Sequence, residues 1–311
     1  LLKDMREPGS IGTLMIDEAG QAQPQMAVGA IYRARRVLIV GDPKQVEPVV
    51  TDDLNLLKAA YSEPVYQNYK DKSLSVQRCG DIINPFGTFF HNGTDYPDWV
   101  GCPLLVHRRC LSPMYDISNQ ISYDGMMKQQ TLRPSEKKEA MFLLKNSQWI
   151  DISGTEKGMK NHYVPTQGAK ACELVELAFQ QADFPNLYII SPFTQVVNGI
   201  RNELLQYAKS HPDSALSTKS KALGPWLSSN IGTVHKFQGK EADEVIFLLG
   251  CNLKQKDSYA VKRFVNSNIV NVAATRAKYR LYIIGDQRVW KENRYIREAK
   301  AIMDASCNRQ S

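Results

Sequence analysis

Short apolar runs alternate along the chain with segments of helical periodicity, and no other feature constrains the fold as strongly. The runs lie at 13–17, 36–42, 149–153, 187–191, 230–234, 244–250 and 281–286. The helical candidates between them include 25–35, 168–182, 196–209 and 288–305. Strands that are apolar on both faces and separated by helices are typical of a parallel sheet covered by helices on both sides. We therefore expect an α/β fold, with a loop or linker at about 75–101 and a surface loop at 211–229.

Composition agrees with a folded globular chain. Hydrophobic residues make up 43% of the 311 residues and charged residues 23%, and this length suffices for two domains. The net charge of +7 fits either a solvated surface or a polyanionic partner. No apolar run approaches the ~20 residues of a membrane span, so we expect no membrane partner.

The six cysteines contain no C-x-x-C pair, which is typical of reduced thiols in a cytoplasmic protein. Cys102, His107 and Cys110 come closest to a zinc motif in the sequence. They have no evident fourth ligand and lack zinc-finger spacing, so we do not predict zinc there.

An acidic pair follows the first apolar run. The strand at 13–16 would deliver Asp17 and Glu18 to the carboxyl edge of a parallel sheet, where ligands bind. Asp17 would then organise the shell of a Mg²⁺ ion, and Glu18 would orient or deprotonate an attacking water. An acidic pair that caps the next helix is the alternative.

The second run also ends in polar residues. Gly41, Asp42 and Pro43 force a turn at the same edge, and Gln45 follows just past it. The Gln45 amide could bond both a γ-phosphate and the attacking water, whereas the alternative is a plain turn. Two such strand ends about 25 residues apart favour a nucleotide site.

Six segments resemble the motifs of superfamily 1 helicases. The sequence "IDEAGQAQP" followed by "GDPKQVEPV" is similar to motifs II and III of the nonsense-mediated-decay helicase type, in the 5′-to-3′ branch. The segments resembling motifs IV, IVa, V and VI follow in family order at 104–127, 188–201, 231–248 and 271–286. The resemblance implies RecA-like motor domains of the P-loop NTPase type. Residues 1–100 would be the C-terminal part of a first motor domain plus a linker, and 101–311 a complete second one.

The resemblance also implies two arginine fingers. His107-Arg108-Arg109 stands where the family has Gln-Tyr-Arg, so Arg109 takes the place of the family arginine and Arg108 is the alternative. Arg276, in "ATRAK", is the finger of motif VI. A planar guanidinium suits the charge that develops on a transferred phosphoryl group, although a surface salt bridge is the usual role of an arginine.

Further nucleotide contacts are implied for Asp17, Asp42, Gln45, Gly239 and Glu241. Gly239 would permit close approach of the backbone to the nucleotide, and Glu241 would contact the ribose hydroxyls.

Contacts to single-stranded DNA or RNA are implied for a second group of residues. Hydroxyl, backbone and ring groups of this kind bind phosphate, sugar and base. A core position is the alternative for Phe193. The group comprises Ser191, Pro192, Phe193, Thr233 and His235.

The phosphate loop G-x-x-x-x-G-K-[ST] does not occur in the sequence, which begins at Leu1. We therefore expect a C-terminal fragment of an ATP-dependent helicase or translocase, with ATP as substrate and Mg²⁺ as cofactor. Its expected partners are single-stranded nucleic acid and the upstream half of its own first motor domain, without which it should be inactive. The alternative is a helicase-like module that binds nucleic acid or protein without hydrolysing ATP.

Overall fold

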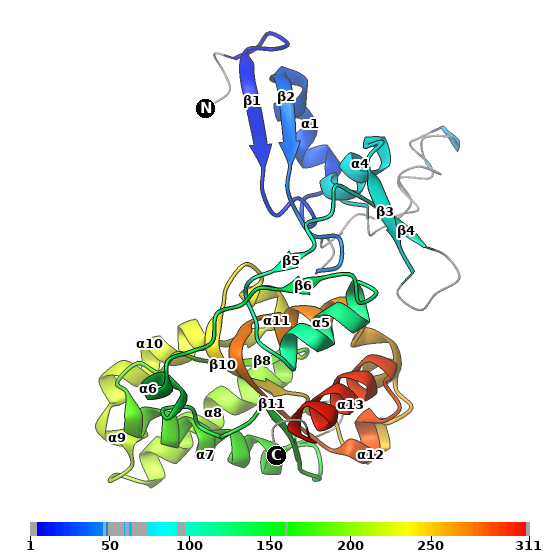
Figure 1. Ribbon diagram of the computed structural model, residues 1–311. Coiled ribbons are helices and arrows are strands. Elements are labelled where there is room, and N and C mark those ends of the chain that lie inside the picture. Colours follow the sequence, from blue (N-terminus) through cyan, green and yellow to red (C-terminus); the bar gives the residue numbers. More distant parts are fainter. Residues whose placement is uncertain are drawn as a thin grey trace. The chain divides into compact units, whose positions relative to one another are not determined.

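The computed structural model (Figure 1) describes residues 5–45, 48, 59, 62–63, 74–91, 97–158 and 161–308. The chain divides into two compact units, unit 1 at 1–104 and unit 2 at 105–311. Each unit has its own sheets.

Unit 1 begins with a strand–helix–strand segment. The parallel strands β1 (Ile11–Ile16) and β2 (Ala34–Ile39) pair in register Leu14 to Val37. Helix α1 (Pro24–Arg33) connects them and starts at a proline, which suits the first turn of a helix. The two strands and this helix were all predicted.

The region predicted as a loop or linker at 75–101 is largely ordered secondary structure, so that prediction was wrong. It forms helix α4 (Val76–Ile83) and an antiparallel pair, β3 (Gly87–Phe90) with β4 (Asp98–Gly101). Ser75 caps α4 because its Oγ accepts a hydrogen bond from the Arg78 backbone N at 3.1 Å. Across the pair, the Phe89 and Trp99 rings meet edge to face, with centroids 5.0 Å apart.

Unit 2 is built on a five-stranded sheet in which every pair of neighbours is parallel. The strand order is β7-β11-β10-β8-β9. These strands are β7 (Gln148–Asp151), β8 (Leu187–Ser191), β9 (Ile231–Thr233), β10 (Ala242–Leu248) and β11 (Ala277–Gly285). Each of the five apolar runs predicted in this part of the chain forms one of them, and the central strands are buried on both faces.

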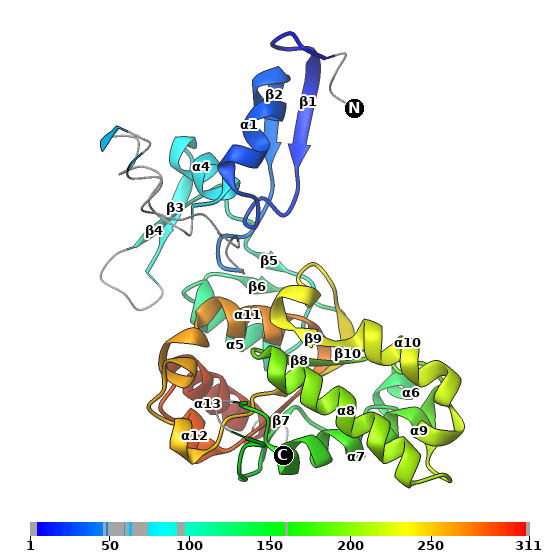
Figure 2. The same ribbon diagram turned by 180° about the vertical axis from the view of Figure 1, so that it is seen from behind.

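Helices cover both faces of this sheet (Figures 1 and 2). One face carries α7 (Pro165–Gln181), α8 (Thr194–Ser210), α9 (Ala215–Thr218) and α10 (Ser220–Asn230). The other carries α5 (Met114–Ser122), α11 (Ser267–Thr275), α12 (Gln287–Trp290) and α13 (Arg294–Asn308). The predicted α/β class, with RecA-like parallel strands between two helical layers, is confirmed.

Smaller elements complete unit 2. Strands β5 (Val106–His107) and β6 (Lys128–Gln129) form a short parallel pair, and α6 (Glu136–Glu139) precedes β7. The 3₁₀ turns are η1 (Val234–Phe237) and η2 (Leu253–Gln255), and η3 (Ala260–Phe264) is a π-helix. No helix among the described residues is long and apolar enough to cross a membrane.

Candidate nucleotide and nucleic-acid sites

The loops that follow β1 and β2 lie directly against each other. The Ala19 backbone N donates to the Val40 carbonyl at 3.0 Å. A Cβ at Gly41 would lie 2.7 Å from the Gly20 N, and a Cβ at Gly20 would lie 2.8 Å from the Asp42 carbonyl oxygen. Because neither position has room for a side chain, the two glycines allow the predicted motifs II and III to meet.

Asp17 and Glu18 come directly after β1. Asp17 is exposed and accepts the Glu18 backbone N on Oδ1 at 2.8 Å, while Glu18 is half-buried and accepts the Gln21 amide at 3.3 Å. Glu18 has a φ of +51°, a conformation that costs energy in residues other than glycine and that often occurs at active sites. Helix α1 takes Gln23 as its N-cap and has no acidic residue in its first turn. The pair therefore does not cap that helix.

Asp42 organises the second loop. Its Oδ1 accepts the Lys44 backbone N at 2.9 Å, and its Oδ2 accepts the Gln45 side-chain Nε2 at 3.1 Å. The Gln45 amide is thereby oriented. Its Oε1 is buried and has no hydrogen-bond partner among the described residues. Buried acceptors are nearly always satisfied, so this oxygen is a candidate contact for a water or a ligand donor.

The same loop is tied to β4 by an ion-pair cluster that sequence reasoning missed. The buried Lys44 ammonium pairs with Asp98, which also accepts from Arg78 at 3.3 Å. Burial raises the pKa of Asp98, but the hydrogen bond and charge of Lys44 outweigh it, so this pKa lies below its usual value. Asp98 is therefore ionised at neutral pH.

In unit 2, Glu241 forms ion pairs with basic residues of two other predicted motifs. Its Oε2 is 3.3 Å from Arg109 Nε, and its Oε1 is 3.3 Å from Lys278 Nζ. Arg108 instead is exposed and donates to the Gln130 side chain at 3.3 Å. The predicted motif IV arginine and motif V glutamate are thus brought together. Lys278 was missed, although it stands only two residues after Arg276.

Arg276 is fully buried inside unit 2. Its guanidinium donates to the Val272 carbonyl, the Phe237 carbonyl and the Thr275 Oγ1, each at 3.2 Å. These bonds make it a link between α11 and η1. Gly239 follows η1 with a φ of +75°, which glycine adopts without strain. A phosphate contact for Arg276 stays a prediction.

The residues predicted to bind nucleic acid lie at two adjacent strand ends. Ser191 of β8 and Thr233 of β9 are register partners, so the parallel pairing brings these two together. Phe193 is only 6% exposed, and its ring lies 4.5 Å from that of His162 and 5.6 Å from that of Phe264. Its environment favours the core alternative.

The other members of this set differ in exposure. Pro192 and Ser191 are buried, and Ser191 Oγ accepts the Phe193 backbone N at 3.2 Å. Thr233 is half-buried and His235 is exposed. A bound strand would therefore reach the last two side chains most directly.

Comparison with known proteins agrees with these motifs. Residues 98–288 match a family described as "AAA domain", and residues 1–53 match a second family with the same description. This chain belongs to the AAA domain family. The predicted resemblance to superfamily 1 helicases of the nonsense-mediated-decay type is confirmed by its relatives.

Two curated relatives of this AAA domain chain illustrate the likeness. Regulator of nonsense transcripts 1 of Dictyostelium discoideum is 24% identical over 89% of the chain, which spans 18% of that protein. ATP-dependent helicase NAM7 of Saccharomyces cerevisiae is 24% identical over 93% of the chain, which spans 27% of that protein. The chain thus covers less than a third of either relative. Among solved structures, an Arterivirus helicase in complex with DNA gives a TM-score of 0.38 at 14% identity, over 88% of this chain and 39% of that one.

The relatives include ATP-dependent helicases, which implies the use of ATP together with a divalent metal. The residues after β1 offer ligands of the type that Mg²⁺ binds. Asp17 and Glu18 offer carboxylate oxygens, and the exposed Asp17 is open to solvent on a loop that Gly20 and Gly41 fix in place. Oxygen ligands with retained waters are what Mg²⁺ requires. The residues present therefore fit the metal.

Proposed function

We propose that this chain is part of an ATP-dependent helicase or translocase that couples ATP hydrolysis to movement on single-stranded DNA or RNA. Membership of the AAA domain family supports the class of activity. The observation that supports hydrolysis is the buried Gln45 Oε1, which has no hydrogen-bond partner among the described residues. It stands on a loop packed against Ala19 and Gly20, the two residues that follow Asp17 and Glu18. An acceptor in this place suits an attacking water.

Each predicted site residue of unit 1 would have its own role. Asp17, with Glu18, would hold Mg²⁺, which when bound neutralises charge on the phosphates. Glu18 would orient or deprotonate the water, and Gln45 would fix its position through the amide that Asp42 orients.

Unit 2 would contribute the positive charge. Arg109 and Arg276 would stabilise the charge that develops on the γ-phosphate, and Glu241 would bind the ribose hydroxyls. In the structure, Glu241 is paired with Arg109 and Lys278. On ribose binding, Glu241 would replace these half-exposed ion pairs, which are individually weak, with hydrogen bonds to the ribose hydroxyls. Thr233 and His235, together with the neighbouring Ser191 and Pro192, would face the nucleic acid from the ends of β8 and β9, while Phe193 would support them from the core.

Residues 1–100 would be the later part of a first motor domain and 101–311 the second. The strand pair β1–β2 exposes apolar side chains, with Met15 68%, Leu38 49% and Val37 36% exposed. Apolar surface of this kind is usually covered in a complete domain. We infer that upstream strands of the same domain cover it, and that this chain alone does not turn over ATP because the phosphate loop is elsewhere.

The test is the ATPase rate of the complete protein, with and without single-stranded DNA or RNA. Glu18→Gln should abolish most of the stimulated rate, whereas Glu7→Gln, an exposed acid of the same unit, should preserve it. Equal rates for wild type and Glu18→Gln would remove Glu18 from the mechanism. Tight nucleic-acid binding by a wild type that does not hydrolyse ATP would favour the binding-module alternative instead.

A further inference from the structure

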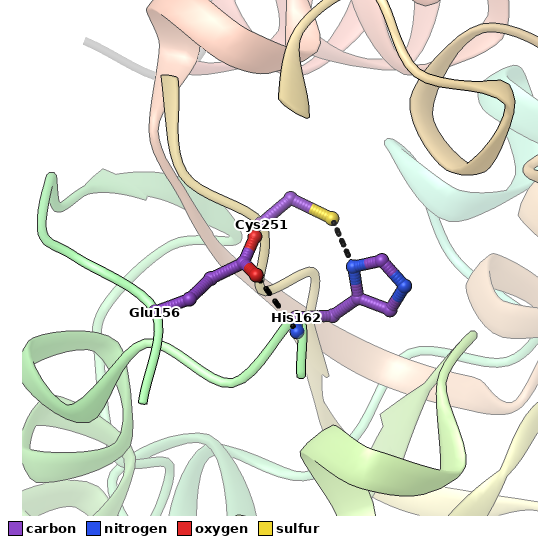
Figure 3. Close-up of side chains that lie close together, drawn as sticks. All are labelled: Glu156, His162 and Cys251. Carbon is purple, nitrogen blue, oxygen red and sulfur yellow. Dashed lines mark hydrogen bonds between the residues drawn. The ribbon is translucent and has the colours of Figure 1, made fainter. Parts of the chain in front are cut away.

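Three side chains of different metal-ligating types meet in unit 2, apart from the sites above (Figure 3). Glu156 and His162 belong to the segment between β7 and α7, and Cys251 follows β10. The carboxylate, imidazole and thiol ligand atoms all lie within 4.8 Å of one another. Cys251 is buried, and the other two are half-buried.

The backbone around these residues is fixed by hydrogen bonds between the two segments. The Cys251 N donates to the His162 carbonyl at 2.7 Å. The Glu156 carboxylate accepts the His162 N and the Asn252 N, each at 3.2 Å. A Cβ at Gly250 would lie 2.3 Å from the His162 carbonyl oxygen, so the two segments are in closest contact here.

Two of the three residues adopt a backbone conformation that is rare outside glycine. His162 has a φ of +59° and Cys251 a φ of +61°. Each such residue costs on the order of 1–3 kcal/mol, and such residues gather at ligand clamps and active sites. In both residues this conformation accompanies a side chain turned toward the other, as Figure 3 shows.

The spacing of the two softer ligands fits zinc. Cys251 Sγ lies 3.6 Å from His162 Nδ1. A tetrahedral ion with bonds of about 2.3 Å to sulfur and 2.05 Å to nitrogen holds those two atoms about 3.6 Å apart. Glu156 can still ligate, because a carboxylate has about four lone-pair sites and two are used here.

We propose that Glu156, His162 and Cys251 form a Zn²⁺ site with water in the fourth position. Thiolate and imidazole ligands select zinc over Mg²⁺ or Ca²⁺, which prefer oxygen. On binding, the Cys251 thiol loses its proton to solvent and its sulfur forms the bond to zinc. The site is independent of ATP hydrolysis.

A metal here would stiffen the start of α8. The His162 ring lies against the Phe193 ring, which precedes that helix. Zinc would fix the imidazole, and through it Phe193 and the neighbouring Ser191 and Pro192, which are proposed to face nucleic acid. The ion would thus act as a structural clamp between β10 and the loop before α7.

The experiment loads the chelator-treated chain with one zinc equivalent, removes free metal and measures bound zinc by native mass spectrometry. We expect one zinc per chain in the wild type and none in Cys251→Ser or His162→Gln. Cys172→Ser, which alters a buried cysteine of α7 in the same unit, is the matched control and should keep the metal. Cobalt substitution should give thiolate-to-cobalt absorption that Cys251→Ser lacks.

The proposal would be overturned if the wild type retained no zinc. It would also be overturned if Cys251→Ser and His162→Gln both retained as much zinc as the wild type. If Cys251→Ser fails to fold, the cobalt spectrum of the wild type tests for the thiolate ligand instead, because a site without a thiolate gives no thiolate-to-cobalt absorption. Glu156→Gln, which keeps an amide oxygen to accept a backbone bond, should fold and bind zinc more weakly. Unchanged affinity in that variant would also contradict the proposed ligand set.

Discussion

At the scale of single residues, two adjacent arginines of motif IV have different surroundings. Arg109 is half-buried against Glu241, the proposed ribose ligand, whereas Arg108 is exposed and bonded to Gln130. We expect Arg109→Ala to lower the ATP hydrolysis rate of the complete protein about 10³-fold, the lower end of the range for an arginine finger. Arg108→Ala should retain most of the rate. The reverse order of the two effects, measured as kcat at saturating ATP, would assign the finger to Arg108.

A buried carboxyl gives a pH-dependent prediction. Glu244 is buried, and its Oε1 accepts the Tyr282 hydroxyl at 2.5 Å and the Leu143 N at 2.9 Å. Burial raises the pKa of Glu244 above its usual value, partly offset by the Tyr282 bond. Ionisation of Glu244 therefore costs folding free energy as pH rises through its folded pKa. Tyr282→Phe removes a donor to the ionised form and should cost about 1–3 kcal/mol at neutral pH.

This cost should shrink as pH falls through the folded pKa of Glu244, because the protonated carboxyl loses only a neutral hydrogen bond. Urea unfolding of the chain at neutral and acidic pH measures the difference. Tyr279→Phe, on the same strand and less buried, is the control and should show a small effect at both pH values. A cost for Tyr282→Phe that is equal at both values would show that the protonation state of Glu244 does not change between them.

Sequence patterns could predict some of these residues and not others. Asp17, Glu18 and Gln45 follow apolar strands, so the strand ends alone predicted that their loops meet. Local sequence could not predict that Arg276 is held by three bonds inside unit 2. The cluster of Glu156, His162 and Cys251 was missed for a related reason. His162 and Cys251 are 89 positions apart and meet only through the sheet.

At the scale of elements, two helical glycines should respond oppositely to the same change. A Cβ at Gly199 of α8 would lie 2.3 Å from the Tyr163 Cγ, whereas a Cβ at Gly29 of α1 would meet only the Arg33 guanidinium, at an ordinary contact distance of 3.5 Å. Alanine favours helices over glycine by roughly 0.5–1 kcal/mol, so Gly29→Ala should stabilise the chain by about that much. Gly199→Ala should destabilise it by about 1–3 kcal/mol, because the buried Tyr163 ring must move.

Thermal and urea unfolding of the two variants side by side check this pair. Both changes add the same methyl group to a helix, so the propensity gain is common to both and the difference reports packing alone. Equal stabilisation by the two substitutions would mean that the Tyr163 ring can repack without loss of stability.

Strands were easier to predict than the connections between them. Each predicted strand formed. In the sheet of unit 2 the central strands are buried on both faces and are therefore apolar throughout, which makes them easy to find in the sequence. The predicted loop at 211–229 instead forms α9 and α10, where Leu216, Leu223 and Trp226 are buried. These helices were not predicted because their few apolar residues are separated by serine, lysine and Pro225, so no helical periodicity was evident. The single helix predicted at 288–305 forms two helices, α12 and α13, with a break between Trp290 and Arg294. Asn293 caps the second helix, because its side chain accepts a hydrogen bond from the Ile296 N at 2.9 Å.

At the scale of the whole molecule, the two units differ in how much apolar surface they bury. The described residues of unit 1 include four buried apolar side chains, those of Ala19, Val76, Phe90 and Val100, whereas apolar residues fill both faces of the sheet in unit 2. Burial of apolar surface is the main favourable term in folding. Unit 2 should therefore hold most of the stability of this chain.

Hydrogen exchange of backbone amides tests that difference. In this chain the amides of β1 and β2 should exchange about 100-fold or more faster than those of β10 and β11, because regions with few buried contacts open locally at low cost. In the complete protein, upstream strands would cover the apolar side chains of β1 and β2, so exchange there should slow while β10 and β11 change little. The same fast exchange of β1 and β2 in both proteins would contradict the proposal that this chain completes a larger motor domain.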